Sequence, residues 1–523
     1  MKTRTVLEAI GAALLLLPWY LPFIAPSNLS VYHHGLPVTN LIGGMLVDLL
    51  GIAILVLGVL AAIRYLPAVA RRVVETLLAG FMLFRIVDVA IKAWGVTPET
   101  NNFQQFARWN SVRNECCDVV LLLSVALMYF FPRIAQPAVR AIRIFIAAFA
   151  FSAFWIIPQL IHVALVRPSD TIAASPHPPP SSSGAPSRRI VWILFDELSY
   201  DQVFDHPASG MEFPNFDRLR NQSVTFSNLG PAGFFTDRII PSLFLGRRID
   251  QIRSTVDSNL WYKDESQNRW LAYDPNDTLF ALAQRNGWTT GVEGWYNPYC
   301  QILASMLNAC SWESQDFQIL STEAYGASED KSALANAATL WKEFLARLTR
   351  RPVNNGIVHV RAYQNEMTHS SALIANGQIG FVFLHFPIPH PPGIYDRRLH
   401  MLRTGGDYLD NLVLADDTMG ALMREIDNAP SAGQTTVIVT SDHSWRIPLW
   451  RGVEGWSPEE ERSSGGRFDE RPVLLIHFPG QTSGNDVASP QPELLEHDIV
   501  AGMLLGKIDN PEDLSAFLAH RGR

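Results

Sequence analysis

Long apolar runs crowd the first third of this 523-residue chain, and no run of comparable length follows them. A helix needs roughly 20 apolar residues to cross a bilayer. Five stretches approach that length, at about Ala9–Ala25, Leu41–Ile63, Val73–Trp94, Cys116–Pro132 and Ile144–Val166. No small-residue cleavage site follows the first stretch, which therefore reads as a span and not as a signal peptide. We predict a five-helix transmembrane region over residues 1–167.

Basic residues in the short loops predict the orientation of these spans. With a cytoplasmic N-terminus, the outer loops carry only Arg108 and Arg113. The inner segments carry Lys2, Arg4, Arg64, Arg71, Arg72, Arg133, Arg140 and Arg143. Five spans then place everything after Val166 outside the cytoplasm. We expect a multi-pass protein of the plasma membrane with an external globular part.

Charged residues interrupt the third apolar stretch, at Glu75, Arg85, Asp88 and Lys92. Such side chains are costly to expose to lipid. The separations among Arg85, Asp88 and Lys92 allow charges to pair on one helix face. One interpretation is pairing between helices, and the other is a site for a lipid head group near the outer surface.

A segment rich in Pro, Ser and Ala occupies residues 168–188 and cannot bury a core. It predicts a semi-extended tether, followed by one globular domain over residues 189–523. Cys300 and Cys310 are the only cysteines of that domain. A disulfide between them suits an oxidising compartment, and two free thiols are the alternative.

Four short apolar runs in the globular part are typical of strands buried on both faces. They are Ile190–Phe195, Phe381–Phe386, Thr436–Thr440 and Val473–Phe478. A helical pattern covers Tyr408–Ile426. Strands that alternate with helices predict an α/β domain with a mostly parallel central sheet. A net charge of −8 gives no case for binding nucleic acid.

Three of these runs end in, or lead into, side chains that bind metal ions. These side chains are Asp196 and Glu197, His385 and His390, and Asp442 and His443. Sites in open α/β sheets form outside the carboxyl ends of the strands, so these groups could converge on one ion. An acid after a single strand is often a helix cap, but three such strand ends together favour a metal site.

Thr236 lies at the head of a predicted helix, where free backbone N–H groups and the helix dipole favour anions. A metal-bound hydroxyl at this position would lose its proton more easily and could attack phosphorus. The alternative interpretation is an ordinary helix cap.

The order of these segments resembles the alkaline phosphatase/sulfatase superfamily over nearly all of residues 189–480. FDELSYD leads to PNFDRLRNQSVTFSN, which is similar to the PN-hydrophobic-D-x-L…V-x-F-x-N segment of that superfamily. Thr236 precedes Gly246 by ten residues, as the nucleophile precedes a glycine in these enzymes. SDHS at 441–444 resembles their late SDHG metal motif. The spans plus an exported domain resemble the phosphoethanolamine transferases and lipoteichoic acid synthases of bacterial envelopes, which implies a periplasm.

The nucleophile separates the branches of this superfamily. Sulfatases resemble one another in a Cys or Ser followed by x-Pro-x-Arg, and TDRIIP at 236–241 lacks that signature. The phosphoethanolamine transferases have Thr with a proline five residues on, as here. LHFPIPHPP is similar to their LH…SHGP stretch, with His385 and His390 five residues apart. The resemblance therefore favours phosphoryl transfer over hydrolysis of sulfate esters.

The resemblance also implies roles for individual residues. Asp196, Thr236, Asp442 and His443 would bind a divalent metal, with Glu197 as the alternative to Asp196. Zinc suits oxygen and imidazole ligands, and manganese, magnesium or calcium are alternatives. His390 would contact the phosphoryl oxygens or the leaving group. The residues expected to touch an anionic substrate are His385, Arg446 and Arg451.

The chain departs from the transferase pattern after the Asp-His pair. The transferases carry another histidine about a dozen residues past the Asp-His pair, where this chain has SWRIPLWRGVEGW. Arg446 and Arg451 lie there and could hold an anionic head group, or could be surface arginines. A site with a single metal ion is the simpler expectation, so we expect one metal. Asp416, on the apolar face of the 408–426 helix, is expected to be structural rather than catalytic.

The leading hypothesis is transfer of a phosphoethanolamine- or phosphoglycerol-type head group from a membrane phospholipid to an envelope lipid or glycan. Thr236 would form a covalent phospho-intermediate. The first alternative is a membrane-anchored sulfatase or phosphodiesterase-type hydrolase of the same superfamily. The second is a non-catalytic scaffold, which the full set of acid, Thr and His residues disfavours.

Overall fold

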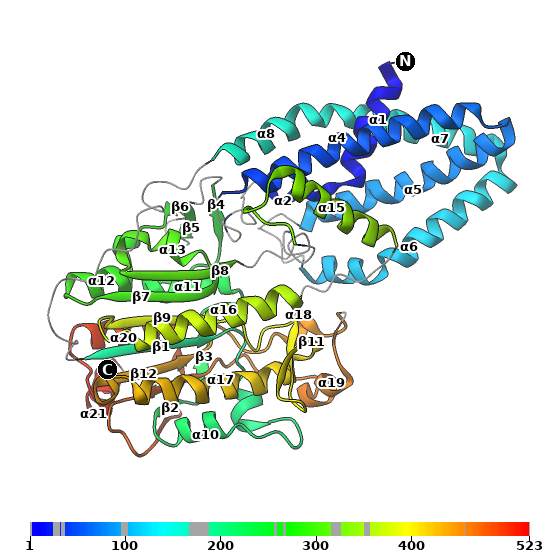
Figure 1. Ribbon diagram of the computed structural model, residues 1–523. Helices are drawn as coiled ribbons and strands as arrows, with labels where there is room; N and C mark the ends of the chain where they lie inside the picture. Colours follow the sequence, from blue (N-terminus) through cyan, green and yellow to red (C-terminus); the bar gives the residue numbers. More distant parts are fainter. Residues whose placement is uncertain are drawn as a thin grey trace.

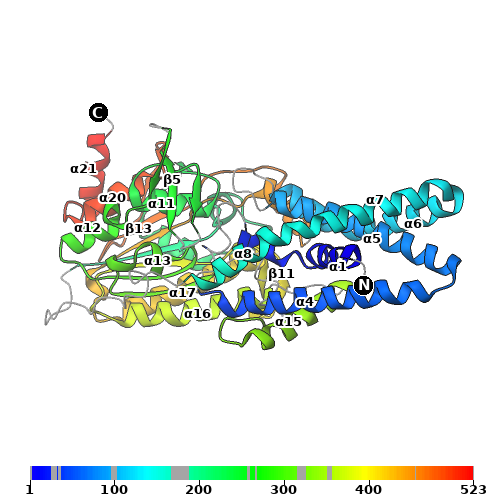
Figure 2. The ribbon, with the colours of Figure 1, turned by 90° about the horizontal axis from the view of Figure 1, so that it is seen from above.

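A helical N-terminal part and an α/β domain make up the computed structural model of this chain, and the helices extend away from one end of the domain (Figures 1 and 2). The structure describes residues 3–24, 32, 37–95, 103–166, 188–255, 259–264, 268–314, 326–349, 356–453 and 455–521. The predicted tether at 168–188 lies outside these residues except for Arg188.

Helices account for nearly all of the described N-terminal part. They are α1 (Thr3–Leu16), α2 (Leu21–Ile24), α4 (Thr39–Ala62), α5 (Ala68–Gly95), α6 (Phe103–Phe130), α7 (Pro132–Phe149) and α8 (Ala153–Leu165). Each predicted apolar stretch falls on one or two of these helices. The long ones run side by side in Figures 1 and 2.

Fewer of these helices than predicted are suited to cross a membrane. Among the described residues, Thr39–Tyr65 and Arg133–Leu165 are long and apolar enough, and α1 with α2 could form a third span bent by 59°. The prediction of five spans is therefore wrong. Charged residues are the reason, because they interrupt the apolar stretches of α5 and α6. Two or three candidate spans still indicate a membrane anchor.

The charges of α5 face neighbouring helices. Asp88 is fully buried, forms an ion pair with Arg85, and lies 3.1 Å from Lys92 Nζ. Arg85 also donates hydrogen bonds to backbone carbonyls of α1. Arg143 of α7 pairs with Glu75 at 3.3 Å. Asp88 is thus paired within α5, whereas Glu75 and Arg85 connect α5 to neighbouring helices. Both kinds of contact lower the cost of charge in an apolar bundle.

An eight-stranded mixed sheet forms the centre of the α/β domain, in the order β14-β2-β13-β12-β1-β9-β7-β8. Its strands are β1 (Arg189–Phe195), β2 (Val224–Phe226), β7 (Thr290–Tyr296), β8 (Ala309–Ser314), β9 (Phe381–Phe386), β12 (Thr435–Thr440), β13 (Leu474–His477) and β14 (Asn485–Val487). Neighbours are parallel except for β13, which is antiparallel to both β12 and β2. All four predicted strands are present, and the mostly parallel sheet is confirmed.

Both faces of this sheet are covered, so alternate residues of a strand enter different cores. Trp192 and Leu194 of β1 pack with α11 (Thr236–Leu245), α12 (Leu279–Arg285) and α20 (Leu495–Leu504). Val191 and Ile193 pack on the other side. The helices there are α10 (Pro214–Arg220), α16 (Gly356–Ala375) and α17 (Tyr408–Asn428). Two-sided burial explains why β1 reads as a continuous apolar run.

Shorter elements surround the sheet. They are β3 (Leu229–Gly230) with β15 (Gln491–Pro492), β4 (Ile252–Ser254) with β5 (Leu260–Asp264) and β6 (Arg269–Ala272), β10 (Gly393–Asp396) with β11 (Met401–Gly406), and the helices α13 (Tyr299–Ile302), α18 (Ile447–Trp450), α19 (Pro458–Ser464) and α21 (Pro511–Arg521). The longer helix α15 (Ala333–Leu348) lies against the N-terminal helices instead.

Asp416 of α17 is structural, as expected. Its carboxylate accepts hydrogen bonds from the backbone N–H groups of Asn215 and Phe216 at 3.1 and 2.8 Å, and from the Asn215 side chain at 2.9 Å. These donors belong to the first turn of α10, whose N–H groups have no partner within the helix. Asp416 thus joins two helices that cover the same face of the sheet.

Helix α15 leaves the α/β domain and packs along α4 (Figure 1). Glu329, just before α15, accepts hydrogen bonds from the backbone N–H groups of Asn40 and Leu41 at the start of α4. Trp341 and Phe344 of α15 pack near Ile52 of α4. The domain is therefore joined to the helical part by a capped helix end and an apolar contact.

Close approach of the two helices requires glycine at position 44. A Cβ there would lie 2.8 Å from Asn336 Cβ and 3.0 Å from the Ala337 backbone N. We expect Gly44→Leu to weaken the docking of α15 by about 1–3 kcal/mol, since overpacked contacts cost that much. Hydrogen exchange of the α15 amides should then be roughly 5- to 100-fold faster. Gly51→Leu on the same helix is the control, because no atom lies within 4 Å of its Cβ position; equal exchange in both variants would contradict the contact.

Candidate active site

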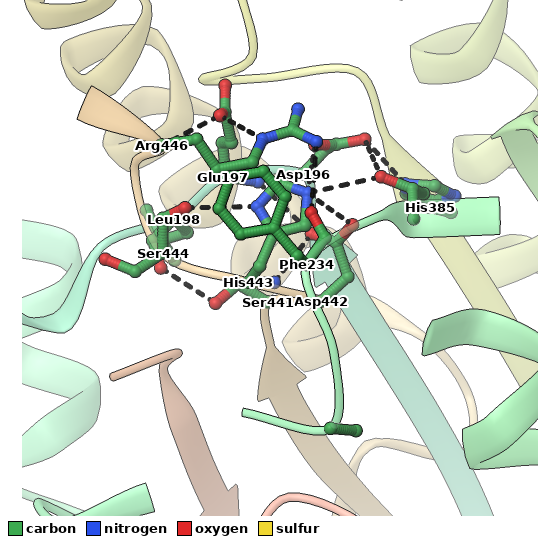
Figure 3. Close-up of polar contacts among 12 residues, drawn as sticks. Asp196, Glu197, Leu198, Phe234, His385, Ser441, Asp442, His443, Ser444 and Arg446 are labelled. Atoms are coloured by element: carbon green, nitrogen blue, oxygen red, sulfur yellow. Dashed lines mark hydrogen bonds and ion pairs between the residues drawn. The ribbon is translucent and has the colours of Figure 1, made fainter. Parts of the chain in front are cut away.

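Side chains from two strand ends and one helix start converge at the carboxyl edge of the central sheet (Figure 3). Asp196 follows β1, Asp442 and His443 follow β12, and Thr236 is the first residue of α11. The Thr236 hydroxyl lies 3.3 Å from Asp196 Oδ2 and 3.3 Å from His443 Nε2. His443 Nε2 lies 3.1 Å from Asp442 Oδ2. Residues 246 positions apart in sequence, Asp196 and Asp442, are thus neighbours because β1 and β12 are paired.

The four side chains are almost entirely withdrawn from solvent, with Thr236 the most exposed at 5%. Asp196, Asp442 and His443 offer ligand atoms within 4.8 Å of one another, and no other described group of His, Cys, Asp or Glu does so. Asp196 Oδ1 and Asp442 Oδ2 accept no hydrogen bond from any described residue. Buried carboxylate oxygens without donors are costly, and a divalent cation would satisfy both. The residues therefore fit a metal ion.

The charges at this site act on one another strongly. Burial, together with repulsion from Asp442, raises the pKa of Asp196 well above its ordinary value. Burial opposes ionisation of Asp442 as well, but attraction from His443 outweighs it and lowers the pKa of Asp442. The pKa of His443 is raised, because attraction from the two aspartates exceeds the effects of burial and of Arg446. The pocket favours added positive charge.

Thr236 does not cap α11. The N-cap position is Phe235, and no side-chain hydrogen bond caps this helix end. The Thr236 hydroxyl faces Asp196 and His443, while its backbone begins a helix of ten residues. The start of that helix carries partial positive charge, which favours an anion or a developing oxyanion near the hydroxyl. The nucleophile interpretation of Thr236 thus agrees with its position better than the cap.

His390 lies at the edge of the same pocket. Its backbone N–H donates to the Asp196 carbonyl at 3.1 Å, and its ring packs against Trp295 and Trp450 at centroid distances of 5.1 and 5.3 Å. Burial and the positive charge of Arg446 lower the pKa of His390 well below its ordinary value. These effects keep the imidazole neutral.

A model of the sulfatase family matches residues 188–484, more than half of the chain, and covers every residue of this site. The chain belongs to the sulfatase family. Its fold and the buried Asp196/Asp442/His443 group are those of a sulfatase-superfamily enzyme with a metal site. No curated protein matches the chain by sequence.

Solved structures similar to this sulfatase-family chain include both hydrolases and a synthase. The Ps i-CgsB structure is 14% identical in sequence, and its alignment covers 62% of this chain and 73% of the Ps i-CgsB chain, with a TM-score of 0.41. PsFucS1 sulfatase from Pseudoalteromonas sp. is 16% identical over 62% and 68%, with a TM-score of 0.38. The lipoteichoic acid synthase LtaP from Listeria monocytogenes is 12% identical over 64% and 76%, with a TM-score of 0.37. These similarities do not favour transferases over sulfatases.

Glu197, the expected alternative metal ligand in this sulfatase-family site, points away from the other carboxylates. Its backbone has a φ of 69°, an uncommon left-handed conformation for a non-glycine residue. The turn aims its N–H at Asp442 Oδ1, 3.2 Å away, and its carboxylate at Arg446 Nε and Trp450 Nε1, 2.7 and 2.8 Å away. Glu197 is therefore held in an ion pair beside the site (Figure 3).

The three expected substrate-contacting residues occupy different places. Arg446 is buried, donates to the Phe234 carbonyl and lies close enough to lower the pKa of His390 and oppose protonation of His443. Arg451 is half-exposed and pairs with Glu461, away from the metal group. His385 is buried, with Nε2 3.7 Å from Asp196 Oδ2. Only Arg446 is thus placed to act on an anion in the pocket.

Sequence reasoning missed the aromatic walls of the site. Trp295 at the end of β7 and Trp450 in α18 enclose His390, and Tyr299 contacts His385. No motif or spacing marks these three residues, because each reaches the site from a separate element. They keep water from much of the pocket, which strengthens its electrostatic interactions.

Proposed function

We propose that this protein transfers a phosphoryl-linked head group, of phosphoethanolamine or phosphoglycerol type, from a membrane phospholipid to an envelope lipid or glycan. The observation that carries the proposal is the Thr236 hydroxyl at 3.3 Å from both Asp196 and His443, at a helix start. A nucleophile in this setting favours attack on phosphorus. The absence of a Cys or Ser nucleophile signature in TDRIIP disfavours sulfate ester hydrolysis.

The first chemical step forms a bond between Thr236 Oγ1 and the donor phosphorus and breaks the bond from phosphorus to the lipid alcohol. The hydroxyl proton of Thr236 ends on that alcohol, and we propose His390, at the edge of the pocket, as the group that carries it. In the second step the acceptor hydroxyl attacks phosphorus, the bond from phosphorus to Thr236 Oγ1 breaks, and the acceptor's proton ends on Thr236. Both steps transfer a phosphoryl group between two alcohols, so the atoms balance without a further reactant.

Asp196, Thr236, Asp442 and His443 would hold one divalent cation, zinc in our proposal, with manganese, magnesium or calcium as alternatives. When bound, the cation supplies positive charge that eases deprotonation of Thr236 and offsets charge on the phosphoryl oxygens. Arg446 adds a fixed positive charge beside His390, and its planar guanidinium suits an anionic phosphoryl group.

The membrane anchor would keep this site beside a lipid donor. Candidate spans lie in the N-terminal helices, and α15 joins the domain to α4. We propose a cytoplasmic N-terminus and a catalytic domain on the periplasmic side of the inner membrane, following the distribution of basic residues. Along the chain, the predicted linker between the two parts is 168–188.

A hydrolase is the second candidate, favoured by the family description, with water as the acceptor in the second step. The deciding experiment is mass spectrometry of envelope lipids and glycans from cells that express wild type, Thr236→Ala, or Thr368→Ala as a control on an exposed face of α16. A phosphoethanolamine or phosphoglycerol adduct with wild type and control, but not with Thr236→Ala, is expected. Identical profiles, together with phosphodiester cleavage by the purified wild type, would establish the hydrolase instead.

A further inference from the structure

A buried tyrosine, Tyr299, contacts His385, which lies beside the proposed metal ligand Asp196. The Tyr299 hydroxyl lies 2.6 Å from His385 Nδ1, and both residues are withdrawn from solvent. On the opposite edge of the imidazole, Nε2 lies 3.7 Å from Asp196 Oδ2 and makes no hydrogen bond with any described residue. The three side chains therefore form a row that ends at a carboxylate of the proposed metal site.

The sequence next to Tyr299 fixes its position. Cys300 is bonded to Cys310 of β8, so the short helix α13 is covalently attached to the strand beside β7. This bond settles the open question about the two cysteines. The disulfide is formed by the residue next to Tyr299, which leaves the backbone of Tyr299 little freedom to move.

Packing restricts the ring of Tyr299, in addition to the disulfide that restricts its backbone. A Cβ at Gly294 of β7 would lie 2.4 Å from Tyr299 Cε2, so the ring rests directly on the strand backbone. Phe383 of β9 and Phe244 of α11 contact the ring at centroid distances of 5.6 and 6.1 Å. Because α11 also begins with Thr236, the ring is packed against the nucleophile helix.

We propose that Tyr299 is a positioning residue for the metal site: it holds His385 so that Nε2 faces Asp196, and the Cys300–Cys310 disulfide holds Tyr299. The inference rests on the metal site of the proposed function. Partners of this kind orient metal-binding groups and affect metal affinity without touching the ion.

Packing alone does not account for the hydroxyl. A phenylalanine would fill the same apolar space, whereas a buried hydroxyl is costly without a hydrogen-bond partner. Its partner is the imidazole edge opposite Asp196. Removing the hydroxyl would leave the ring of His385 held by fewer contacts, so the carboxylate of Asp196 would lose a fixed neighbour.

The test is a zinc titration of the full-length protein in detergent after removal of metal by a chelator, followed by calorimetry. We expect Tyr299→Phe to weaken Zn²⁺ binding by up to about 10-fold, because a direct partner of a metal ligand contributes about 10- to 100-fold and Tyr299 acts one contact further out, through His385. The matched control is Tyr363→Phe, which also loses a buried hydroxyl, bonded at 2.8 Å to Thr418 on α17. Its Zn²⁺ affinity should equal that of wild type.

Two further variants complete the design. His385→Gln should weaken Zn²⁺ binding at least as much as Tyr299→Phe, and it serves as the test if Tyr299→Phe does not fold. The double variant Cys300→Ser with Cys310→Ser should show a smaller loss in the same direction. Wild-type affinity in a folded Tyr299→Phe variant would overturn the inference, and so would wild-type affinity in His385→Gln.

A separate variant distinguishes this failure from failure of the metal site itself. Asp442→Ala removes a proposed ligand. If Asp442→Ala loses Zn²⁺ and Tyr299→Phe does not, the positioning role is wrong and the metal site stands. If neither variant changes Zn²⁺ binding, the metal site and the proposed function built on it are both wrong.

Discussion

Thr236→Ala is expected to reduce turnover by on the order of 10³- to 10⁶-fold, because loss of a nucleophile removes the covalent route entirely. The Thr236 hydroxyl has no neighbour of the same kind in the metal group, whose other members are carboxylates and an imidazole. Turnover should be measured with a fluorescent phospholipid donor under saturating conditions. Intact-mass spectrometry of wild type quenched during turnover should show a head-group adduct on the peptide that contains Thr236.

Thr236→Ser is the matched control for this prediction. It keeps an oxygen at the same position and removes only a methyl group, so partial activity should remain. A Thr236→Ala variant that folds and turns over donor lipid as wild type does would contradict a nucleophilic role. An adduct found on another residue would move the nucleophile there.

Asp442→Ala is expected to weaken binding of divalent metal by more than about 100-fold, since loss of a ligand should exceed the loss of an outer partner. Activity should fall with it. Asp442 Oδ2 is buried and faces His443 Nε2 at 3.1 Å, and Oδ1 accepts from the backbone N–H of Glu197. The substitution therefore removes both a ligand and the anchor of the turn after β1.

Metal content can be measured by mass spectrometry of the purified protein after dialysis against zinc, manganese, magnesium or calcium. Asp427→Ala, at an exposed position on α17, is the control and should bind metal as wild type does. Full metal content in Asp442→Ala would remove Asp442 from the ligand set. Hydrogen exchange of the β1–β12 region would show whether lost activity reflects local unfolding.

Most of the candidate site can be predicted from the sequence, because Asp196, Asp442 and His443 directly follow short apolar runs. A strand buried on both faces has a local signature, and β1, β9 and β12 appear close to their predicted bounds. Parallel strands bring their carboxyl ends to one edge. Thr236 was recognisable from its position at a helix start and from its spacing to Gly246.

The direction in which the Asp196 and Glu197 side chains point cannot be predicted from the sequence, because it depends on contacts with residues far along the chain. Asp196 and Glu197 are adjacent acids, and the sequence alone left either as the ligand. The left-handed backbone at Glu197 turns its carboxylate to Arg446, which lies 249 residues later. No local pattern reports such a turn.

The apolar helices, the strands, and the acids and histidines at the strand ends can be predicted from short windows of sequence, because they depend on local periodicity and burial. Tertiary structure decided which of them act together. It paired Glu75 of α5 with Arg143 of α7 and directed Arg85 of α5 to backbone carbonyls of α1. It also reversed β13 and brought Tyr299 to His385. These outcomes depend on partners far along the chain, which no window of sequence contains.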